Sequence, residues 1–416
     1  MKKLFLILFY LVSVIASLLF SYENPEKIEK IKDYFKKNKN IKVEKVDGDN
    51  LIFYANAFNV NVKKIIDLKE KTAFLTYPNN GLKFDIKKLK IFTQNGFLLE
   101  NFSQKKLLLP NYFTLQRNGG VKTIIFVENN SIGLISGEKN GCYFAALILL
   151  ETGKELLKTD CLPEYSKNND FNGLGSSNIH LNNHIYFSLG TPEKHVNKNS
   201  ILAQDDNSLF GKILRIDKNE LLSAINNNRK LNIYTFSKGH RVPQGLTKIN
   251  EFIFSVEHGP KGGDELNRII EKANYGWPIV SYGTNYLRDN GGDGRSFPSN
   301  HELNNFSEPI LAFVPSIGIS SVNKCPNILK EYYKKNCLMA LSLYGNDLRK
   351  GNSLIIFLLN EKLNKVDSFE IIKLDNLVLR HFVTNNYNEL YSDPEGNIYI
   401  SADKKGIYKI SFNNFR

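Results

Sequence analysis

Residues whose types could support chemistry are concentrated between positions 239 and 286 of this 416-residue chain. Three segments stand out: 239–245 (GHRVPQG), 257–267 (EHGPKGGDELN) and 274–278 (NYGWP), which holds the only tryptophan. Glycine and proline fix an irregular backbone that can turn carbonyl oxygens outward. Carbonyl oxygens, carboxylates and water are the ligands of a hard cation such as calcium. The cluster therefore indicates a calcium-binding region, with an ordinary long turn as the alternative.

Other common enzyme classes leave no motif in the sequence. There is no GxSxG elbow, no P-loop, no HExxH segment and no Rossmann glycine fingerprint. The 55 Lys and Arg exceed the 42 Asp and Glu, for a net charge of +13, but they are scattered along the chain. Scattered charge favours a solvated surface over a nucleic-acid footprint.

The elements that must position this cluster are mostly strands. From about residue 50 onward, short runs rich in Ile, Phe, Tyr and Val are broken by Asn, Gly, Asp and Lys. One unit recurs, a turn of Asn or Gly followed by a short strand and a small residue. It occupies residues 130–137, 183–190, 250–257 and 396–403. Gaps of roughly 50–70 residues between copies are typical of four-stranded propeller blades with loop insertions.

This periodicity predicts an all-β fold, a propeller more than a sandwich, and leaves the number of blades open. A second strand is expected after three of the copies, at 211–216, 267–270 and 406–410. Helical periodicity is scarce, and it predicts short helices at 24–37 and 217–229.

The cluster resembles the glucose/sorbosone dehydrogenase family, whose members use pyrroloquinoline quinone (PQQ), and within it the soluble aldose sugar dehydrogenases. The family's GHRNPQG-like segment, EHGPxGGDExN loop and NYGWP turn are matched in order and spacing. Further similar stretches are GKILRI at 211–216, PSIGISS at 315–321 and DPEGNIY at 393–399. The resemblance is specific over 170–412 and vague over 22–130. It implies a six-bladed β-propeller spanning residues 22–416, with the cofactor at its top face.

The resemblance also implies roles for individual residues. Gly259 and Pro260 would offer main-chain carbonyls to the calcium beneath PQQ. Glu265 and the carbonyl of Tyr275 would bind a second, structural calcium. Arg241 would face the quinone and stabilise the negative charge that develops on its oxygens.

Arg380 would pair with a PQQ carboxylate, for which a planar guanidinium is suited. The implied reaction oxidises an aldose sugar at C1 to its lactone and passes electrons to an external acceptor. A hydride goes to the quinone while a base removes the hydroxyl proton.

The sequence departs from the family pattern at several positions. The family's base is a His, but the corresponding stretch 170–176 (DFNGLGS) has none, and its nearest aligned residue, Asn172, cannot act as a base near neutral pH. Three further departures remove hydrogen-bonding or cationic groups: Val242, Tyr344 and Val378.

Other titratable residues are candidates for the missing base. Asp170 lies at the start of the departing stretch. His240 and His258 lie inside family-like motifs, where a hydrogen-bonding role is favoured. Three histidines are expected mainly to be solvated: His180, His184 and His195.

Two functions therefore remain open. The first is an exported PQQ- and calcium-dependent aldose sugar dehydrogenase. The alternative is a catalytically inactive propeller that keeps structural calcium and binds carbohydrate or a protein partner. A weaker third reading is a calcium-dependent lactonase-like hydrolase, which would need acidic or Asn side chains converging on the central channel.

The N-terminus and the cysteines indicate the compartment. Lys2 and Lys3 precede an apolar run from Leu4 to Phe20, which predicts a signal peptide at 1–21, or else an N-terminal anchor. We expect a periplasmic or secreted protein with no later membrane span. An even count of four cysteines permits disulfides there. Of three possible pairings, the sequence-local one is Cys142–Cys161 with Cys325–Cys337, and four free thiols are the alternative.

Overall fold

The computed structural model describes residues 43–45, 48, 50–55, 57–78, 82–163, 170–193, 196–227, 229–286, 292–344, 352–374 and 377–416. The expected signal segment at 1–21, the predicted helix at 24–37 and His195 lie outside these ranges.

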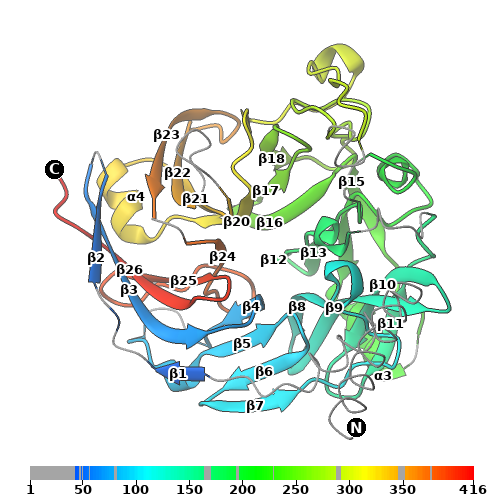
Figure 1. The fold of residues 1–416 in the computed structure, drawn as a ribbon, viewed down its shortest axis with the longest axis horizontal. Coiled ribbons are helices and arrows are strands. Elements are labelled where there is room, and N and C mark those ends of the chain that lie inside the picture. The colour runs from blue at the N-terminus through cyan, green and yellow to red at the C-terminus, as the bar shows by residue number, and fades with distance from the viewer. Residues whose placement is uncertain are drawn as a thin grey trace, which may run out of the picture.

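Six antiparallel sheets are arranged as blades around a central axis (Figure 1), which confirms the predicted six-bladed β-propeller. From the inner strand outward, blade 1 consists of β4 (Thr72–Thr76), β5 (Lys90–Thr93), β6 (Phe97–Glu100) and β7 (Ser103–Lys106). Blade 2 consists of β8 (Val121–Val127), β9 (Asn130–Lys139), β10 (Cys142–Leu149) and β11 (Lys154–Lys158). Blade 3 consists of β12 (Asn178–Leu181), β13 (His184–Leu189), β14 (Lys212–Asp217) and β15 (Tyr234–Lys238).

The second half of the ring repeats the pattern, and the first strands of neighbouring blades contact one another all the way round. Blade 4 is β16 (Val242–Ile249), β17 (Phe252–His258), β18 (Asp264–Ile269) and β19 (Leu311–Phe313); blade 5 is β20 (Ile319–Lys324), β21 (Cys337–Ser342), β22 (Ser353–Leu359) and β23 (Val366–Lys373); blade 6 begins with β24 (Leu379–Phe382), β25 (Ile398–Ala402) and β26 (Gly406–Asn413).

Blade 6 is completed by the N-terminal part of the chain. The strand β3 (Asn59–Leu68) pairs antiparallel with β26, and β1 (Val43–Lys45) and β2 (Asn50–Tyr54) pair with β3. Figure 1 shows β3 and β26, the blue and red ends of the colour scale, side by side. The ring is therefore closed by hydrogen bonds between the two ends of the chain.

The hydrophobic core is divided into clusters between neighbouring blades. The sequence of β10, CYFAALIL, is apolar throughout because both of its faces are buried. Tyr143 and Leu147 pack toward blade 3, whereas Phe144 and Ile148 pack toward blade 1. Successive side chains of a strand point to opposite faces, and both faces of this blade are covered. Alternating polarity is therefore lost in the blade interiors.

The connections at one end of the ring carry the sequence cluster. In each blade, the segment before the inner strand and the loop between the second and third strands lie at the same end, because adjacent strands are antiparallel. We call this end the top face. It receives residues 239–241, the loop 259–263 and the start of β24.

The channel along the axis is filled from the other end by the long connection between β24 and β25. The side-chain amide of Asn388 in this connection donates to Asn178 O at 2.7 Å and to Leu246 O at 3.4 Å, and Asn323 Nδ2 donates to Asn388 O at 3.0 Å. Blade 6 is thereby joined to the inner strands of blades 3, 4 and 5.

Several smaller predictions can be compared with the structure. The predicted helix at 217–229 is α3 (Lys218–Asn227), whereas α4 (Asn327–Tyr333) was not predicted. The disulfides Cys142–Cys161 and Cys325–Cys337 are formed, with Cα–Cα distances of 5.3 and 5.5 Å, which confirms the sequence-local pairing. Across the described ranges, no helix is long and apolar enough to cross a membrane.

Candidate functional site

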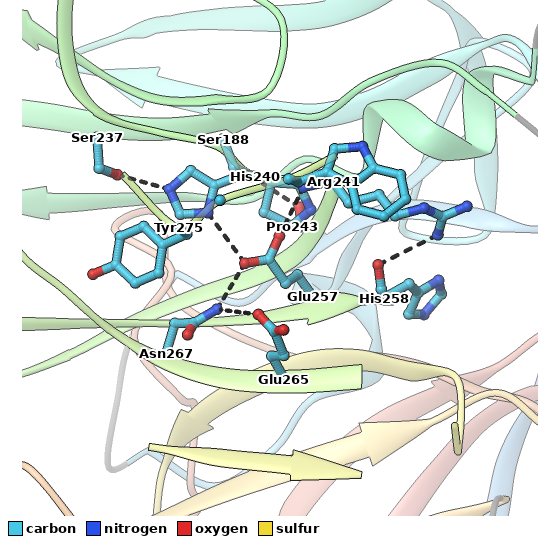
Figure 2. A network of polar contacts seen from close by, with 12 residues as sticks. Ser188, Ser237, His240, Arg241, Pro243, Glu257, His258, Glu265, Asn267 and Tyr275 are labelled. Atoms are coloured by element: carbon cyan, nitrogen blue, oxygen red, sulfur yellow. Dashed lines mark hydrogen bonds and ion pairs between the residues drawn. The ribbon is translucent and has the colours of Figure 1, made fainter. Parts of the chain in front are cut away.

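The segment before β16 and the end of β17 form a buried polar network at the top face. His240 is fully buried, with Nδ1 3.1 Å from Glu257 Oε1 and Nε2 2.8 Å from Ser237 Oγ. Its ring stacks on Tyr275 at a centroid distance of 4.7 Å. Figure 2 shows this chain of contacts continuing from Glu257 through Asn267 to Glu265. His240 thus positions Glu257, in line with its predicted hydrogen-bonding role.

The two glutamates of this network are close and buried. Asn267 Nδ2 donates to Glu257 Oε1 at 2.7 Å and to Glu265 Oε2 at 3.1 Å, so one amide serves both carboxylates. Burial raises the pKa of Glu265 well above its ordinary value, and repulsion from Glu257 raises it further. The charged form of Glu265 is therefore disfavoured unless a cation compensates it.

A small cavity of about 20 Å³ lies beside these carboxylates. Its walls include four residues to which the sequence assigned roles: Arg241, Gly259, Glu265 and Tyr275. Such a volume suits a single water molecule or small ion. The structure thus brings these four predicted residues together, with Pro260 adjacent in the chain.

Arg241 is held from several sides. Its Nε lies 3.2 Å from Glu193 Oε1, Nη1 donates to Gly259 O at 2.6 Å, and its guanidinium lies 5.1 Å from the centroid of the Trp277 ring. Its backbone N–H donates to Glu257 Oε2 at 3.0 Å. The side chain is therefore fixed at the cavity wall, beside the buried carboxyl group of Glu193.

Glu193 was not predicted from the sequence. Burial raises its pKa to about 7, although the Arg241 guanidinium and a hydrogen bond from the Ser200 hydroxyl both favour the charged form. It lies in a loop without a recognisable motif, so no local pattern marked it. Only the contact with Arg241, distant in sequence, reveals its position.

Asp264 lies in the segment 257–267, but the sequence predicts no role for it. Its Oδ2 accepts backbone N–H groups from Ile317, Gly318 and Ile319 at 3.0, 2.6 and 3.1 Å, and Oδ1 accepts from Gly259 N–H at 3.2 Å. This carboxylate therefore ties the loop of blade 4 to the start of the inner strand of blade 5.

Arg380 lies apart from the small cavity, at the start of blade 6. Its guanidinium makes a two-point contact with the Asp403 carboxylate, Nε to Oδ1 at 2.6 Å. Lys122 lies nearby, with Nζ donating to Asn118 O at 2.7 Å, and burial lowers its pKa to about 7. The top face thus gathers cations besides Arg241.

The stretch that lacks the family's His forms a short 3₁₀ turn at Phe171–Leu174. Asp170 caps it, with Oδ1 accepting from Asn172 N–H at 2.9 Å and from Asn118 Nδ2 at 3.1 Å. A side chain at Gly173 would meet Thr191 O at 2.2 Å, so this position requires glycine. Asn172 itself is exposed.

The other candidate histidines, His180, His184 and His258, are buried or lie away from the small cavity's carboxylates. His180, which was expected to be solvated, is instead buried: it packs against Tyr387 at a centroid distance of 4.9 Å, and burial lowers its pKa to about 3. His184 lies 3.9 Å from Asp217 at the start of β13. Burial lowers the pKa of His258, with the Asp264 charge acting in the opposite direction. At two of the positions that depart from the family pattern, Tyr344 and Val378, the side chain carries no cationic group.

Side chains alone do not mark a metal site. Within the part of the chain that the structure describes, no group of three or more His, Cys, Asp or Glu is arranged to hold a metal ion. The predicted calcium ligands are largely main-chain carbonyls, which lie outside that set of groups.

The sequence is similar to known proteins. A family model described as glucose/sorbosone dehydrogenase matches residues 147–407. The chain is 31% identical over 112 residues to the aldose sugar dehydrogenase YliI of Escherichia coli K12, a match covering 25% of this chain and 28% of the relative. It is 34% identical over 101 residues to quinoprotein glucose dehydrogenase B of Acinetobacter calcoaceticus, covering 23% and 21%. These matches thus span about a quarter of the relatives' length.

Solved structures are similar over most of the chain. A glucose dehydrogenase crystal structure has a TM-score of 0.64 at 20% identity and covers 85% of this chain and 99% of its own. The apo form of the soluble aldose sugar dehydrogenase of Escherichia coli has a TM-score of 0.61 at 19% identity, with the same coverage. The PQQ-bound aldose sugar dehydrogenase of Streptomyces coelicolor has a TM-score of 0.52 at 17% identity, covering 85% and 98%. At such identities the likeness shows a shared fold.

Proposed function

The chain belongs to the glucose/sorbosone dehydrogenase family, and from that premise we propose that it is an exported, PQQ- and calcium-dependent aldose sugar dehydrogenase. It would oxidise an aldose at C1 to the lactone and pass electrons to an external acceptor. The observation that carries the proposal is the meeting of Arg241, Gly259, Glu265 and Tyr275 around one small cavity at the top face.

The residues around this cavity fit calcium. Glu257 and Glu265 are buried and share a single amide donor, and a hard cation would balance their charge. Glu265 and the Tyr275 carbonyl would bind one ion. The carbonyls of Gly259 and Pro260 would bind the ion associated with PQQ. Gly259 O already accepts from Arg241, and its second lone pair is available for a metal.

The top face also fits an anionic quinone, because Arg241, Arg380 and Lys122 supply cations there. Bound PQQ would supply an electrophilic quinone that accepts two electrons from the sugar. Arg241, fixed by Glu193 and Gly259, would stabilise negative charge on the quinone oxygens. Arg380 would bind a carboxylate by sharing its guanidinium with Asp403.

We assign the proton-accepting role to Asp170. It lies in the stretch that corresponds to the family's base, and its described hydrogen bonds use only Oδ1. The variant Asp170→Asn keeps a side-chain oxygen for the cap. Loss of general-base catalysis typically lowers turnover by about 10²–10⁴-fold.

The test is a titration of the purified protein with PQQ in calcium-containing buffer, followed by absorbance, after which an aldose mixture is added. Saturable binding with sugar-dependent reduction supports the proposal. Asp170→Asn should bind PQQ normally and reduce it at least about 100-fold more slowly, whereas the exposed Asp160→Asn should match the wild type.

A second function is favoured by the departures at Asn172, Tyr344 and Val378, which remove the family's base and two cations. It is an inactive propeller that keeps calcium and binds carbohydrate or a protein partner. No binding at micromolar PQQ, together with calcium binding by calorimetry, would favour this alternative over the dehydrogenase.

A further inference from the structure

A larger cavity, of about 490 Å³, opens on the top face where blades 6, 1 and 2 meet. Its lining comes from segments before inner strands and from loops between second and third strands. The lining residues are Lys69, Glu70, Lys71, Gln94, Asn95, Leu115, Asn118, Gly119 and Lys404. Its volume lies in the range of ordinary small-molecule sites.

The amide side chains of this cavity are already used within the protein. Gln94 Nε2 donates to Asn118 O at 3.0 Å and to Gly119 O at 2.8 Å, which joins blade 1 to blade 2. Asn95 Nδ2 donates to Glu70 Oε2 at 3.2 Å, and Asn118 Nδ2 donates to Asp170 Oδ1 at 3.1 Å. These bonds fix the walls and anchor the Glu70 carboxylate.

The lysines of the cavity differ in their partners. Lys69 Nζ lies 3.2 Å from Asp67 Oδ2 and is neutralised there. Among the residues that the structure describes, neither Lys71 nor Lys404 has a carboxylate within 4.0 Å of its amine. Burial lowers the pKa of Lys71, repulsion from Arg380 and Lys404 adds to this effect, and attraction to Asp403 and Asp170 opposes it. The two amines therefore place positive charge at the cavity without a directly paired carboxylate.

Carboxylates close to this charge are engaged elsewhere. Asp403 is held by both arms of the Arg380 guanidinium, and Asp170 accepts from Asn118 and Asn172. Beside Asn118, the buried amine of Lys122, whose pKa burial lowers to about 7, adds positive charge when it is protonated. In this lining three lysines outnumber the single carboxylate of Glu70, and a concave site with an excess of positive charge attracts anionic ligands.

We propose that this cavity binds the carboxylate or phosphate group of a sugar, so that the substrate is a sugar acid or a sugar phosphate instead of a neutral aldose. Lys71 and Lys404 would contact the anionic group directly. Anion binding stands on the cavity alone, whereas the designation of the bound sugar as a substrate rests on the proposed function.

Isothermal titration calorimetry tests the proposal on the full-length protein, with glucose 6-phosphate, glucuronate and glucose as probes, in the presence and absence of PQQ and calcium. We expect an anionic sugar to bind at least about tenfold more tightly than glucose. Lys71→Gln and Lys404→Gln should each weaken that binding by about tenfold and leave glucose binding unchanged. Lys405→Gln, an exposed neighbour outside the cavity, is the matched control.

The outcomes separate this inference from the proposed function. Anionic sugars that bind while neither they nor neutral aldoses are oxidised would uphold the cavity and overturn the dehydrogenase. Oxidation of glucose with equal affinity for neutral and anionic sugars would overturn the cavity assignment alone. If the two lysine variants lose PQQ binding but keep glucose 6-phosphate binding, the cavity belongs to the cofactor and the inference is wrong.

Discussion

Asp264 shows how one side chain can organise two blades. Four backbone N–H groups, three at Ile317–Ile319 and one at Gly259, point at its carboxylate, and all lie in buried or half-buried surroundings. An unsatisfied buried donor costs roughly 1–3 kcal/mol. Asp264→Ala should therefore lower the free energy of unfolding by about 3 kcal/mol or more in urea. Asp206→Ala, at an exposed ion pair with Lys238, should change it little, and equal losses would contradict the argument.

Glu193 makes a pH-dependent contribution to stability. Burial raises its pKa from 4.5 to about 7, so the folded protein keeps a proton there that the unfolded chain has released. Its stabilising contribution is thus fully present below about pH 4.5 and is lost as pH rises to about 7. Between pH 5 and 7.5 the wild type should lose stability relative to Glu193→Gln, measured by denaturant unfolding. Parallel curves for the two proteins would refute this, and the exposed Glu251→Gln is the control.

The sequence predicted site residues only where a motif is local. Arg241, Gly259, Glu265 and Tyr275 lie in three short segments, and the structure gathers all four around one cavity. Glu193 escaped prediction because its significance depends on a contact with Arg241 across blades. A buried ion pair between loops has no periodicity by which a sequence could mark it.

At the scale of elements, the segment 257–267, which spans the turn between β17 and β18, is the one whose order should depend on calcium. Bound ligand stabilises the folded state by about 2.7 kcal/mol at 100 times its Kd. A chelator should therefore lower the melting temperature of the wild type, but not that of Glu265→Gln, which lacks one predicted ligand charge. An unchanged wild-type melting temperature would count against the calcium site. The exposed Glu302→Gln should behave like the wild type.

The recurring unit in the sequence proved to be one particular strand of the blade. Its copies correspond to β9, β13, β17 and β25, each the second strand from the axis. These strands are buried on both faces and flanked by tight turns, which gives them a strong pattern. The second strand of blade 1, β5, has only four residues, and that of blade 5, β21, reads CLMALS with no β-branched residue. The recurring pattern therefore does not detect β5 and β21, and the number of blades cannot be counted from it.

At the scale of the whole molecule, Phe58 joins the two ends of the chain. Its fully buried ring lies 5.6 Å from the centroid of Phe412 and 5.4 Å from that of Phe415, and 6.3 Å from those of Tyr332 and Tyr333. Truncating a buried Phe typically costs about 3–5 kcal/mol. Phe58→Ala should lower the free energy of unfolding by that amount in urea.

A matched substitution in the same part of the chain controls for the Phe58 prediction. Leu51 in β2 is 44% exposed, so Leu51→Ala should cost far less. Equal losses for the two variants would show that closure of the ring does not depend on this aromatic cluster. A larger loss for Phe58→Ala would place the closing contact at the junction of blade 6 with α4.

The pairing of β3 with β26 also sets an order in time. A ribosome delivers these two strands at opposite ends of synthesis, separated by on the order of half a minute at typical rates. Until β26 emerges, the edge of β3 that pairs with it, from Asn59 to Ile66, has no native hydrogen-bonding partner. Newly made chains are therefore most prone to aggregate during that interval. A chaperone that covers β3 would have the greatest effect on the yield of folded protein.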